Sequence, residues 1–89
     1  DINAAVCKRY GVKQKDLQSK SRKQAIVQAR QIAMFLCHKY TDVTYTQIGR
    51  DFGKRDHSTV LHACNQVARR MGVDKDYRKD VEELESILK

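Results

Sequence analysis

The amino-acid sequence predicts a single small all-α domain. Its 89 residues include no proline and only four glycines, so few positions interrupt a helix. Hydrophobic residues make up 40% of the chain, which is enough for one core but not for a core plus a second domain. Along most of the chain they recur at spacings of three and four, which is the period of a helix with one buried face. We therefore expect one domain over residues 1–89.

The chain is basic, and its charge is unevenly distributed. There are 18 Lys and Arg against 11 Asp and Glu, which gives a formal net charge of +7. Residues 1–73 carry 14 basic and five acidic side chains, whereas residues 74–89 carry four and six. Such a basic body favours a nucleic acid partner, although a solvated lysine-rich surface has the same composition. No apolar run approaches the roughly 18 residues of a membrane span, so we expect a soluble cytoplasmic protein without a membrane partner.

The residues that could carry catalysis or bind a metal are not grouped in the sequence. Cys7, Cys37 and Cys64 are odd in number and lie among apolar helical positions, which indicates reduced thiols rather than a disulfide framework. No C-x-x-C or H-x-x-x-H spacing brings two metal ligands together. Neighbouring pairs such as Cys37-His38 and His57-Ser58 diverge by about 100° on a helix, so they cannot face each other as catalytic groups must. There is also no G-x-x-x-x-G-K-[ST] phosphate loop, so we expect no enzyme activity, metal or cofactor in these residues.

The first part of the chain predicts a short helix, one further turn and a loop. Apolar residues repeat at helical spacing over residues 2–10, and Gly11 follows as a stop signal. Residues 13–16 are polar and lie between two apolar positions, so we expect one more helical turn there. Residues 19–23 contain three cations and no apolar side chain, so we expect an exposed loop, called the basic loop below. This loop is either a solvated linker or a finger that reaches a phosphate backbone or a narrow minor groove.

Residues 24–40 predict the longest and most hydrophobic helix, which should be the centre of the core. Arg30, Gln31 and His38 interrupt its apolar pattern and fall on or near one polar stripe. A solvated face is the default interpretation of this stripe, and phosphate contact is the alternative.

The pattern of the next helix starts with a cap. Thr44 and Gln47 match the S/T-x-x-E/Q capping box, so a helix should begin at Tyr45. The free amides at this helix start, with the hydroxyls of Thr44 and Thr46, offer a place for a phosphate. Gly53 ends the helix and supplies the left-handed residue of a tight turn.

A polar helix start follows the turn. Asp56 is the expected N-cap, and Gly72 is the expected stop. Because the buried side starts at Val60, residues 55–59 project from the first turn with the mixture of donors, acceptors and methyl groups that reads base edges. Residues 45–71 thus have the pattern of a DNA-reading helix-turn-helix. The residues expected on the buried side are Val60, Leu61, Cys64, Val67, Ala68 and Met71.

The last segment, residues 75–88, predicts a helix that begins at Asp74 or Lys75. Its apolar residues follow heptad-like spacing and its acidic residues should lie outside. This apolar seam should pack on the core, since a small domain needs every apolar stripe, although a partner or dimer surface is the alternative. The seam residues are Tyr77, Val81, Leu84, Ile87 and Leu88, and the acidic residues are Asp80, Glu82, Glu83 and Glu85.

The turn and the helix start after it carry a distinctive set of residues. They are Ile48-Gly49, Phe52-Gly53 and Arg55-Asp56-His57-Ser58-Thr59-Val60-Leu61-His62-Ala63-Cys64. Together with residues 29–34 of the long helix, they resemble the C-terminal DNA-binding domain of the bacterial replication initiator family DnaA, and the likeness spans essentially the whole chain. The resemblance implies a helix-turn-helix related to that of the Trp repressor. It also implies monomeric binding to duplex boxes at the chromosomal origin, with the signature in the major groove and the basic loop in the minor groove.

Position by position, the resemblance places base reading on Arg55, Asp56, His57 and Ser58, and the minor-groove contact on Arg22. Side-chain chemistry agrees, because a guanidinium can fork onto guanine and a carboxylate can accept from cytosine N4. The residues expected to make backbone or supporting contacts are Lys20, Lys23, Arg30, Gln31, His38, Thr44, Thr46, Lys54 and Thr59.

Three positions depart from the family pattern. Ala29 and Thr46 stand where proline is seen, and Lys54 stands where a second glycine often follows Phe-Gly. None of them is a base-reading position, so the departures bear on helix geometry and affinity. The resemblance further implies that ATP is bound by a separate domain, and that the full-length protein oligomerises on the origin although this domain alone is monomeric. The competing interpretation is a helical protein-interaction module that uses the 77–88 seam or the polar face of the recognition helix.

Overall fold

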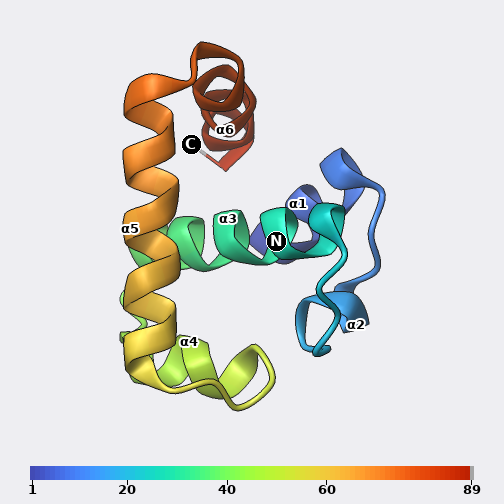
Figure 1. The fold of residues 1–89 in the computed structure, drawn as a ribbon, viewed down its shortest axis with the longest axis vertical. Coiled ribbons are helices and arrows are strands. Elements are labelled where there is room, and N and C mark those ends of the chain that lie inside the picture. The colour runs from blue at the N-terminus through green and yellow to red at the C-terminus, as the bar shows by residue number, and fades with distance from the viewer. Residues whose placement is uncertain (89) are drawn as a thin grey trace.

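Helix α3 is the element around which the other helices are arranged (Figure 1). The computed structural model describes residues 1–88, and this range contains six helices and no strand. Helix α5 crosses α3 near one end of α3 and contacts α4 near its own start and α6 near its own end, while α1 and α2 contact α3 toward its other end. The helices are α1 (Ile2–Tyr10), α2 (Gln14–Leu17), α3 (Gln24–Tyr40), α4 (Tyr45–Asp51), α5 (His57–Val73) and α6 (Lys75–Leu88).

The apolar faces of these helices meet in one core. Their side chains remove apolar area from water, at roughly 25 cal/mol per Å², which is the main favourable term in holding the helices together. Helix α3 contributes the largest share, as its hydrophobic pattern predicted. The largest fully buried side chains are Val6, Leu17, Ile32, Met34, Leu36, Ile48, Val60, Val67, Val81 and Leu84.

The predicted helix ends are confirmed at most positions. Gly11 takes the left-handed conformation, with φ of 66°, and closes α1. The Thr44–Gln47 capping box is formed, since the Gln47 amide donates to the Thr44 hydroxyl at 3.2 Å and the Thr44 amide donates to Gln47 Oε1 at 3.1 Å. The Asp74 carboxylate accepts from the Tyr77 amide at 3.1 Å, so Asp74 caps α6.

Helix α6 closes the core, as predicted for the 77–88 seam. Tyr77, Val81 and Leu84 are buried. Arg9 of α1 forms ion pairs with Asp80 at 2.5 Å and with Glu83 at 2.9 Å, which adds a polar link between the two helices. Because the seam is used inside the domain, little of it is left to dock a partner.

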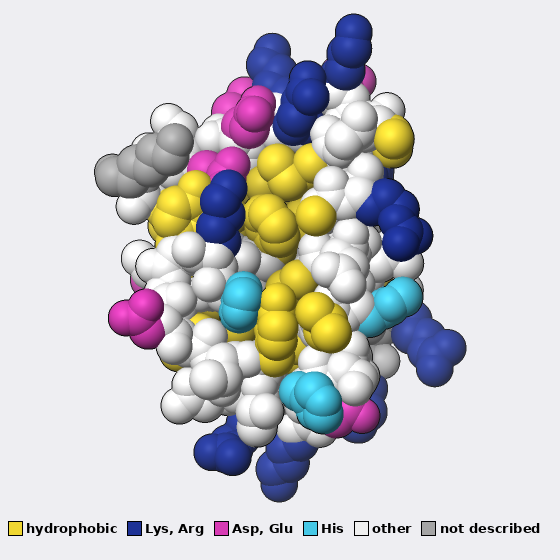
Figure 2. Space-filling model, turned by 90° about the vertical axis from the view of Figure 1, so that its left-hand side faces the viewer, with side chains coloured by type: hydrophobic (Ala, Val, Ile, Leu, Met, Phe, Trp, Pro, Cys, Tyr) yellow, Lys and Arg dark blue, Asp and Glu magenta, His cyan; other side chains and the backbone are white. Residues whose placement is uncertain are grey.

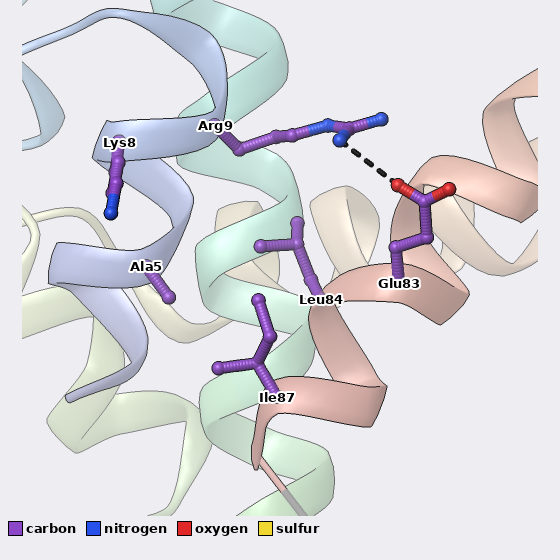
Figure 3. A pocket seen from close by; sticks show the side chains of 6 residues that line it. All are labelled: Ala5, Lys8, Arg9, Glu83, Leu84 and Ile87. Atoms are coloured by element: carbon purple, nitrogen blue, oxygen red, sulfur yellow. Dashed lines mark ion pairs between the residues drawn. The ribbon is translucent and has the colours of Figure 1, made fainter.

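An open groove of about 520 Å³ lies between α1 and α6 (Figure 3). Ala5, Leu84 and Ile87 supply its apolar lining, and the Arg9–Glu83 ion pair spans the two helices at one end. No residue of the basic loop or of the predicted helix-turn-helix lines this groove.

Five predictions about the last two helices, α5 and α6, were wrong. Leu61 and Ala68 are exposed, because the buried arc of α5 is narrower than expected and runs through Val60, Ala63, Cys64 and Val67. Gly72 does not end α5, since the helix continues to Val73 and is capped by Asp74. Ile87 is 70% exposed, at the end of the seam. Glu85 was expected outside but is buried, because Lys39 Nζ at 2.5 Å and the Tyr40 hydroxyl at 2.7 Å donate to its carboxylate.

Candidate nucleic-acid interface

The turn between α4 and α5 is held by a close backbone approach. The Arg55 amide donates to the Gly49 carbonyl at 2.8 Å. A Cβ at Gly49 would lie 2.0 Å from the Arg55 carbonyl oxygen, so only glycine fits at this point of α4. The chain then reverses through Gly53 and Lys54, with φ of 91° and 62°. Lys54 therefore adopts a left-handed backbone conformation although it carries a side chain. The chain thus keeps this turn at the position where the family often has a second glycine.

The first turn of α5 presents a polar, exposed surface. Asp56, His57, Ser58 and Thr59 are all exposed, whereas Val60 is fully buried. Asp56 caps the helix, because its Oδ1 accepts from the Thr59 amide at 2.8 Å. This hydrogen bond to the charged form lowers the pKa of Asp56, so the carboxylate is ionised at neutral pH and can only accept hydrogen bonds.

The side chain of Arg55 does not project with these residues, contrary to the expectation for residues 55–59. It is partly buried, and its Nη2 donates to the Ser19 carbonyl at 2.6 Å while Nη1 donates to the Phe52 carbonyl. Burial lowers the pKa of Arg55. The guanidinium turns inward because carbonyl oxygens of the turn and of the basic loop lie within its reach.

The basic loop is ordered by its serines. Ser19 Oγ donates to the Asp16 carbonyl at 2.7 Å, the Ser21 amide donates to Ser19 Oγ at 3.2 Å, and the Lys23 amide donates to Ser21 Oγ at 3.3 Å. The cations of the loop point outward, since Lys20, Arg22 and Lys23 are exposed. The prediction of a loop is therefore confirmed, because residues 19–23 are not helical and their three cations are exposed.

Arg30 lies beneath the basic loop and not on a solvated stripe, so that default interpretation was wrong for it. The side chain is only 8% exposed. Its Nε donates to the Leu17 carbonyl at 3.1 Å, and its Nη2 donates to the carbonyls of Ser19 at 2.9 Å and Ser21 at 3.1 Å. Burial, followed by the nearby charge of Arg55, lowers the pKa of Arg30. A guanidinium can be buried here because carbonyl oxygens take up its donors. In the free domain, these contacts with carbonyl oxygens make Arg30 a support for the basic loop.

The other predicted residues lie around two shallow recesses. A recess of about 120 Å³ between α3 and α5 is lined by Gln31, Arg55, Thr59 and His62. A more open groove beside the turn brings α4 and the start of α5 together, and its lining residues are Thr46, Arg50, Lys54, Arg55 and Asp56.

Two of the named residues, His38 and Thr44, have other surroundings. His38 is exposed and stacks on Tyr45, with ring centroids 4.0 Å apart and an interplanar angle of 10°. Thr44 is exposed and its hydroxyl is used as the cap of α4. Both residues lie near the start of α4, where backbone amides are free.

Sequence reasoning missed Arg50 and His62. Arg50 is four residues after Thr46 on the exposed face of α4, and His62 is three residues after Thr59 on α5, so helical spacing was the signal that could have found them. Both line the recesses that contain the predicted residues.

The outer face on the α5 side of the molecule is not uniformly basic (Figure 2). Lys and Arg side chains project around its upper, right and lower edges, while hydrophobic and histidine side chains occupy its middle. In this view, most cations therefore lie toward the rim of the face, and its centre is largely apolar.

Within residues 1–88 there is no group of three or more His, Cys, Asp or Glu that could hold a metal ion. No helix in the same range has the length and apolar content needed to cross a membrane.

Comparisons with known proteins agree with this geometry. The family model described as the bacterial dnaA protein helix-turn-helix matches residues 1–67. The chromosomal replication initiator protein DnaA of Bacteroides thetaiotaomicron is 47% identical over 89 residues, and those of Bacteroides fragilis and Streptococcus equi subsp. zooepidemicus are each 45% identical over 89 residues. The match covers 100% of this chain but only 19% of each Bacteroides protein and 20% of the Streptococcus protein.

The chain therefore spans about a fifth of the length of these relatives. The part of the chain that the family model matches is described as a helix-turn-helix. With a family model over residues 1–67 and relatives that match along its full length, this chain belongs to the family of bacterial DnaA helix-turn-helix domains.

Proposed function

We propose that this domain binds double-stranded DNA sequence-specifically at replication-origin boxes and so targets a replication initiator to the chromosomal origin. The observation that carries the proposal is the contact between the two predicted DNA-binding segments. The Ser19 carbonyl of the basic loop accepts from Arg55, which directly precedes the exposed first turn of α5. This contact holds the two segments next to each other in the folded domain, where one duplex would meet both.

The first turn of α5 has the chemistry for reading the major groove. Asp56 is an ionised acceptor suited to cytosine N4, and the exposed His57 and Ser58 can reach thymine methyl groups or a nearby phosphate. The recognition helix of a helix-turn-helix reads bases with its N-terminal residues, which is where these side chains lie.

The basic loop supplies the proposed minor-groove contact. Arg22 is exposed in this loop and would enter the groove, where the negative potential attracts arginine. Lys20 and Lys23 flank it and would contact phosphates, as would Lys54 and Arg50 on the other side of the turn. Thr46, Gln31 and Thr59 line the recesses next to these groups and would make supporting contacts.

Beyond this segment, the proposal follows what the family resemblance implies. The full-length protein would act in the cytoplasm at the nucleoid, bind ATP through a separate domain and oligomerise on the origin. The isolated domain would bind its box as a monomer and without a cofactor. A helical protein-interaction module is less well supported, because Tyr77, Val81 and Leu84 of the seam are buried within the domain.

Titration of the domain with an origin duplex and a scrambled duplex at one salt concentration tests the proposal. Specific DNA-binding domains prefer their site by about 10³-fold or more, so fluorescence anisotropy should separate the two curves widely. Equal affinities for the two duplexes would refute specific binding and leave the interaction module as the better interpretation.

A further inference from the structure

We infer that Arg55 is a positioning residue, which fastens the basic loop to the helix-turn-helix so that the two DNA-binding segments act as one unit. This inference rests on the proposed function, and it gives Arg55 a different role from direct base reading. It concerns how the minor-groove contact at Arg22 depends on a residue of the turn.

The turn between α4 and α5 contacts the chain at the start of the basic loop, at the consecutive residues Gln18 and Ser19. A Cβ at Gly53 would lie 2.3 Å from the Gln18 carbonyl oxygen, so the backbones of the turn and of the loop's first residues are in direct contact. The carbonyl of the following residue, Ser19, accepts from Arg55 Nη2 at 2.6 Å. Both contacts join segments that are more than 30 residues apart in the sequence, so they fix tertiary geometry and not a local turn.

Two arginines converge on one carbonyl oxygen. The Ser19 carbonyl that accepts from Arg55 also accepts from Arg30 Nη2 at 2.9 Å. Arg30 comes from α3 and holds the loop from beneath, whereas Arg55 holds it from the side of the turn. Ser19 is therefore the point at which the core, the loop and the helix-turn-helix are joined.

Both terminal nitrogens of the Arg55 guanidinium are bonded to carbonyl oxygens of the protein. A bidentate contact with guanine O6 and N7 needs two N–H groups of the guanidinium. In the structure, Nη1 of Arg55 donates to the Phe52 carbonyl and Nη2 donates to the Ser19 carbonyl. Turning Arg55 outward would break both bonds and release the loop, so base reading by Arg55 would weaken the contact that Arg22 makes.

The tie matters for binding because Arg22 is three residues from Ser19. Between them the loop is ordered by short serine bonds such as that from the Ser21 amide to Ser19 Oγ. If Ser19 moved, these bonds would move with it and Arg22 would lose its fixed distance from the start of α5. A loop that is ordered before binding loses less conformational entropy on binding, so the tie increases affinity without touching DNA.

A double-mutant cycle measures this dependence. In the otherwise unchanged domain, Arg22→Ala should weaken binding to an origin duplex by about ten-fold or more. In the Arg55→Ala background the same change should cost only about two-fold, because the loop is already displaced. The matched cycle of Arg22→Ala with His57→Ala should be additive, since His57 is exposed and is not bonded to the loop.

Limited trypsin digestion of the free domain tests the tie without DNA. Arg55→Ala should speed cleavage after Lys20, Arg22 and Lys23 several-fold, as read by mass spectrometry. Lys54→Ala is the matched control, because it removes the neighbouring exposed cation of the turn and should leave the cleavage rate in the loop unchanged. Arg55→Lys, which keeps one charged donor, should give an intermediate rate and replaces Arg55→Ala in both experiments if circular dichroism shows the latter unfolded.

The outcomes separate the inference from the function it rests on. Unchanged loop cleavage in the Arg55 variant, or additive losses in the Arg22 cycle, would overturn the positioning role even if the domain binds its box specifically. If the unaltered domain shows no preference for an origin duplex, the proposed function fails, and the digestion rates alone then decide whether Arg55 fastens the loop.

Discussion

Gly49→Ala should destabilise the domain, although helix propensity alone predicts the opposite. Gly49 lies in α4, and replacing glycine by alanine inside a helix normally stabilises it by about 1 kcal/mol. Here the new Cβ would lie 2.0 Å from the Arg55 carbonyl oxygen and 3.3 Å from Val60 Cγ2. Backbone cannot yield as a flexible side chain can, so the turn must shift.

The magnitude follows from what that shift breaks. Overpacking a close contact costs about 1–3 kcal/mol. Loss of the 2.8 Å hydrogen bond from the Arg55 amide to the Gly49 carbonyl adds about 1 kcal/mol. Subtracting the gain in propensity leaves a net loss of about 1–3 kcal/mol. In a domain of this size, that loss lowers Tm by roughly 4–8 °C per kcal/mol.

Gly72→Ala provides the matched control in the same molecule. Gly72 is also inside a helix, α5, but nothing lies within 4 Å of an added Cβ. The same substitution should therefore raise stability by about 0.5–1 kcal/mol. Thermal and urea unfolding followed by circular dichroism measure both changes. A Gly49→Ala variant as stable as Gly72→Ala would refute the close approach of α4 and the turn.

Three further predictions concern the turn, the helix cap and the thiols. Lys54→Gly should raise the free energy of unfolding by up to about 1 kcal/mol, because φ of 62° is strained for a side-chain-bearing residue, and should weaken binding to origin and scrambled duplexes alike. A lower free energy of unfolding for Lys54→Gly in urea would contradict the predicted gain in stability. The pKa of Asp56 is lowered from its ordinary value of 3.8, so its contribution to stability is present above that value and is lost as pH falls through the lower folded-state pKa. Asp56→Asn keeps a capping side chain but removes the carboxylate that titrates. Between about pH 5 and pH 2, the free energy of unfolding of this variant should fall less than that of the unchanged domain. Parallel pH profiles of the two proteins would argue against a stabilising role of the Asp56 carboxylate. Burial raises the pKa of Cys37 and Cys64 to about 11, so iodoacetamide at neutral pH should label both slowly in the folded domain and rapidly in urea. Equal rates in the two conditions would show that these thiols are accessible.

The helices and their caps could be predicted because they depend on local sequence. Thr44 with Gln47, and Asp56 before the polar start of α5, are signals that involve residues at most three apart. The buried positions Tyr77, Val81 and Leu84 of α6 likewise followed from spacing alone. The exposed positions of His57, Ser58 and Arg22 followed from the same reasoning.

The long-range polar contacts could not be predicted in this way. Arg30, Arg55 and Glu85 look like surface residues in sequence, because each lies among polar neighbours or on a polar stripe. Their burial depends on acceptors or donors from distant segments, such as the Ser19 carbonyl for both arginines and Tyr40 for Glu85. Helical periodicity carries no information about which carbonyl oxygens a guanidinium will meet after folding.

The most direct test of specific DNA reading compares His57→Ala with Lys20→Ala on two duplexes. His57 is proposed to touch bases, so its loss should cost ~1–3 kcal/mol on an origin duplex and far less on a scrambled one. Lys20 is proposed to contact phosphate, so its loss should weaken binding to both duplexes by a similar factor. Fluorescence anisotropy at one salt concentration measures all four differences. If His57→Ala weakened binding to the two duplexes equally, the first turn of α5 would not be the reading element.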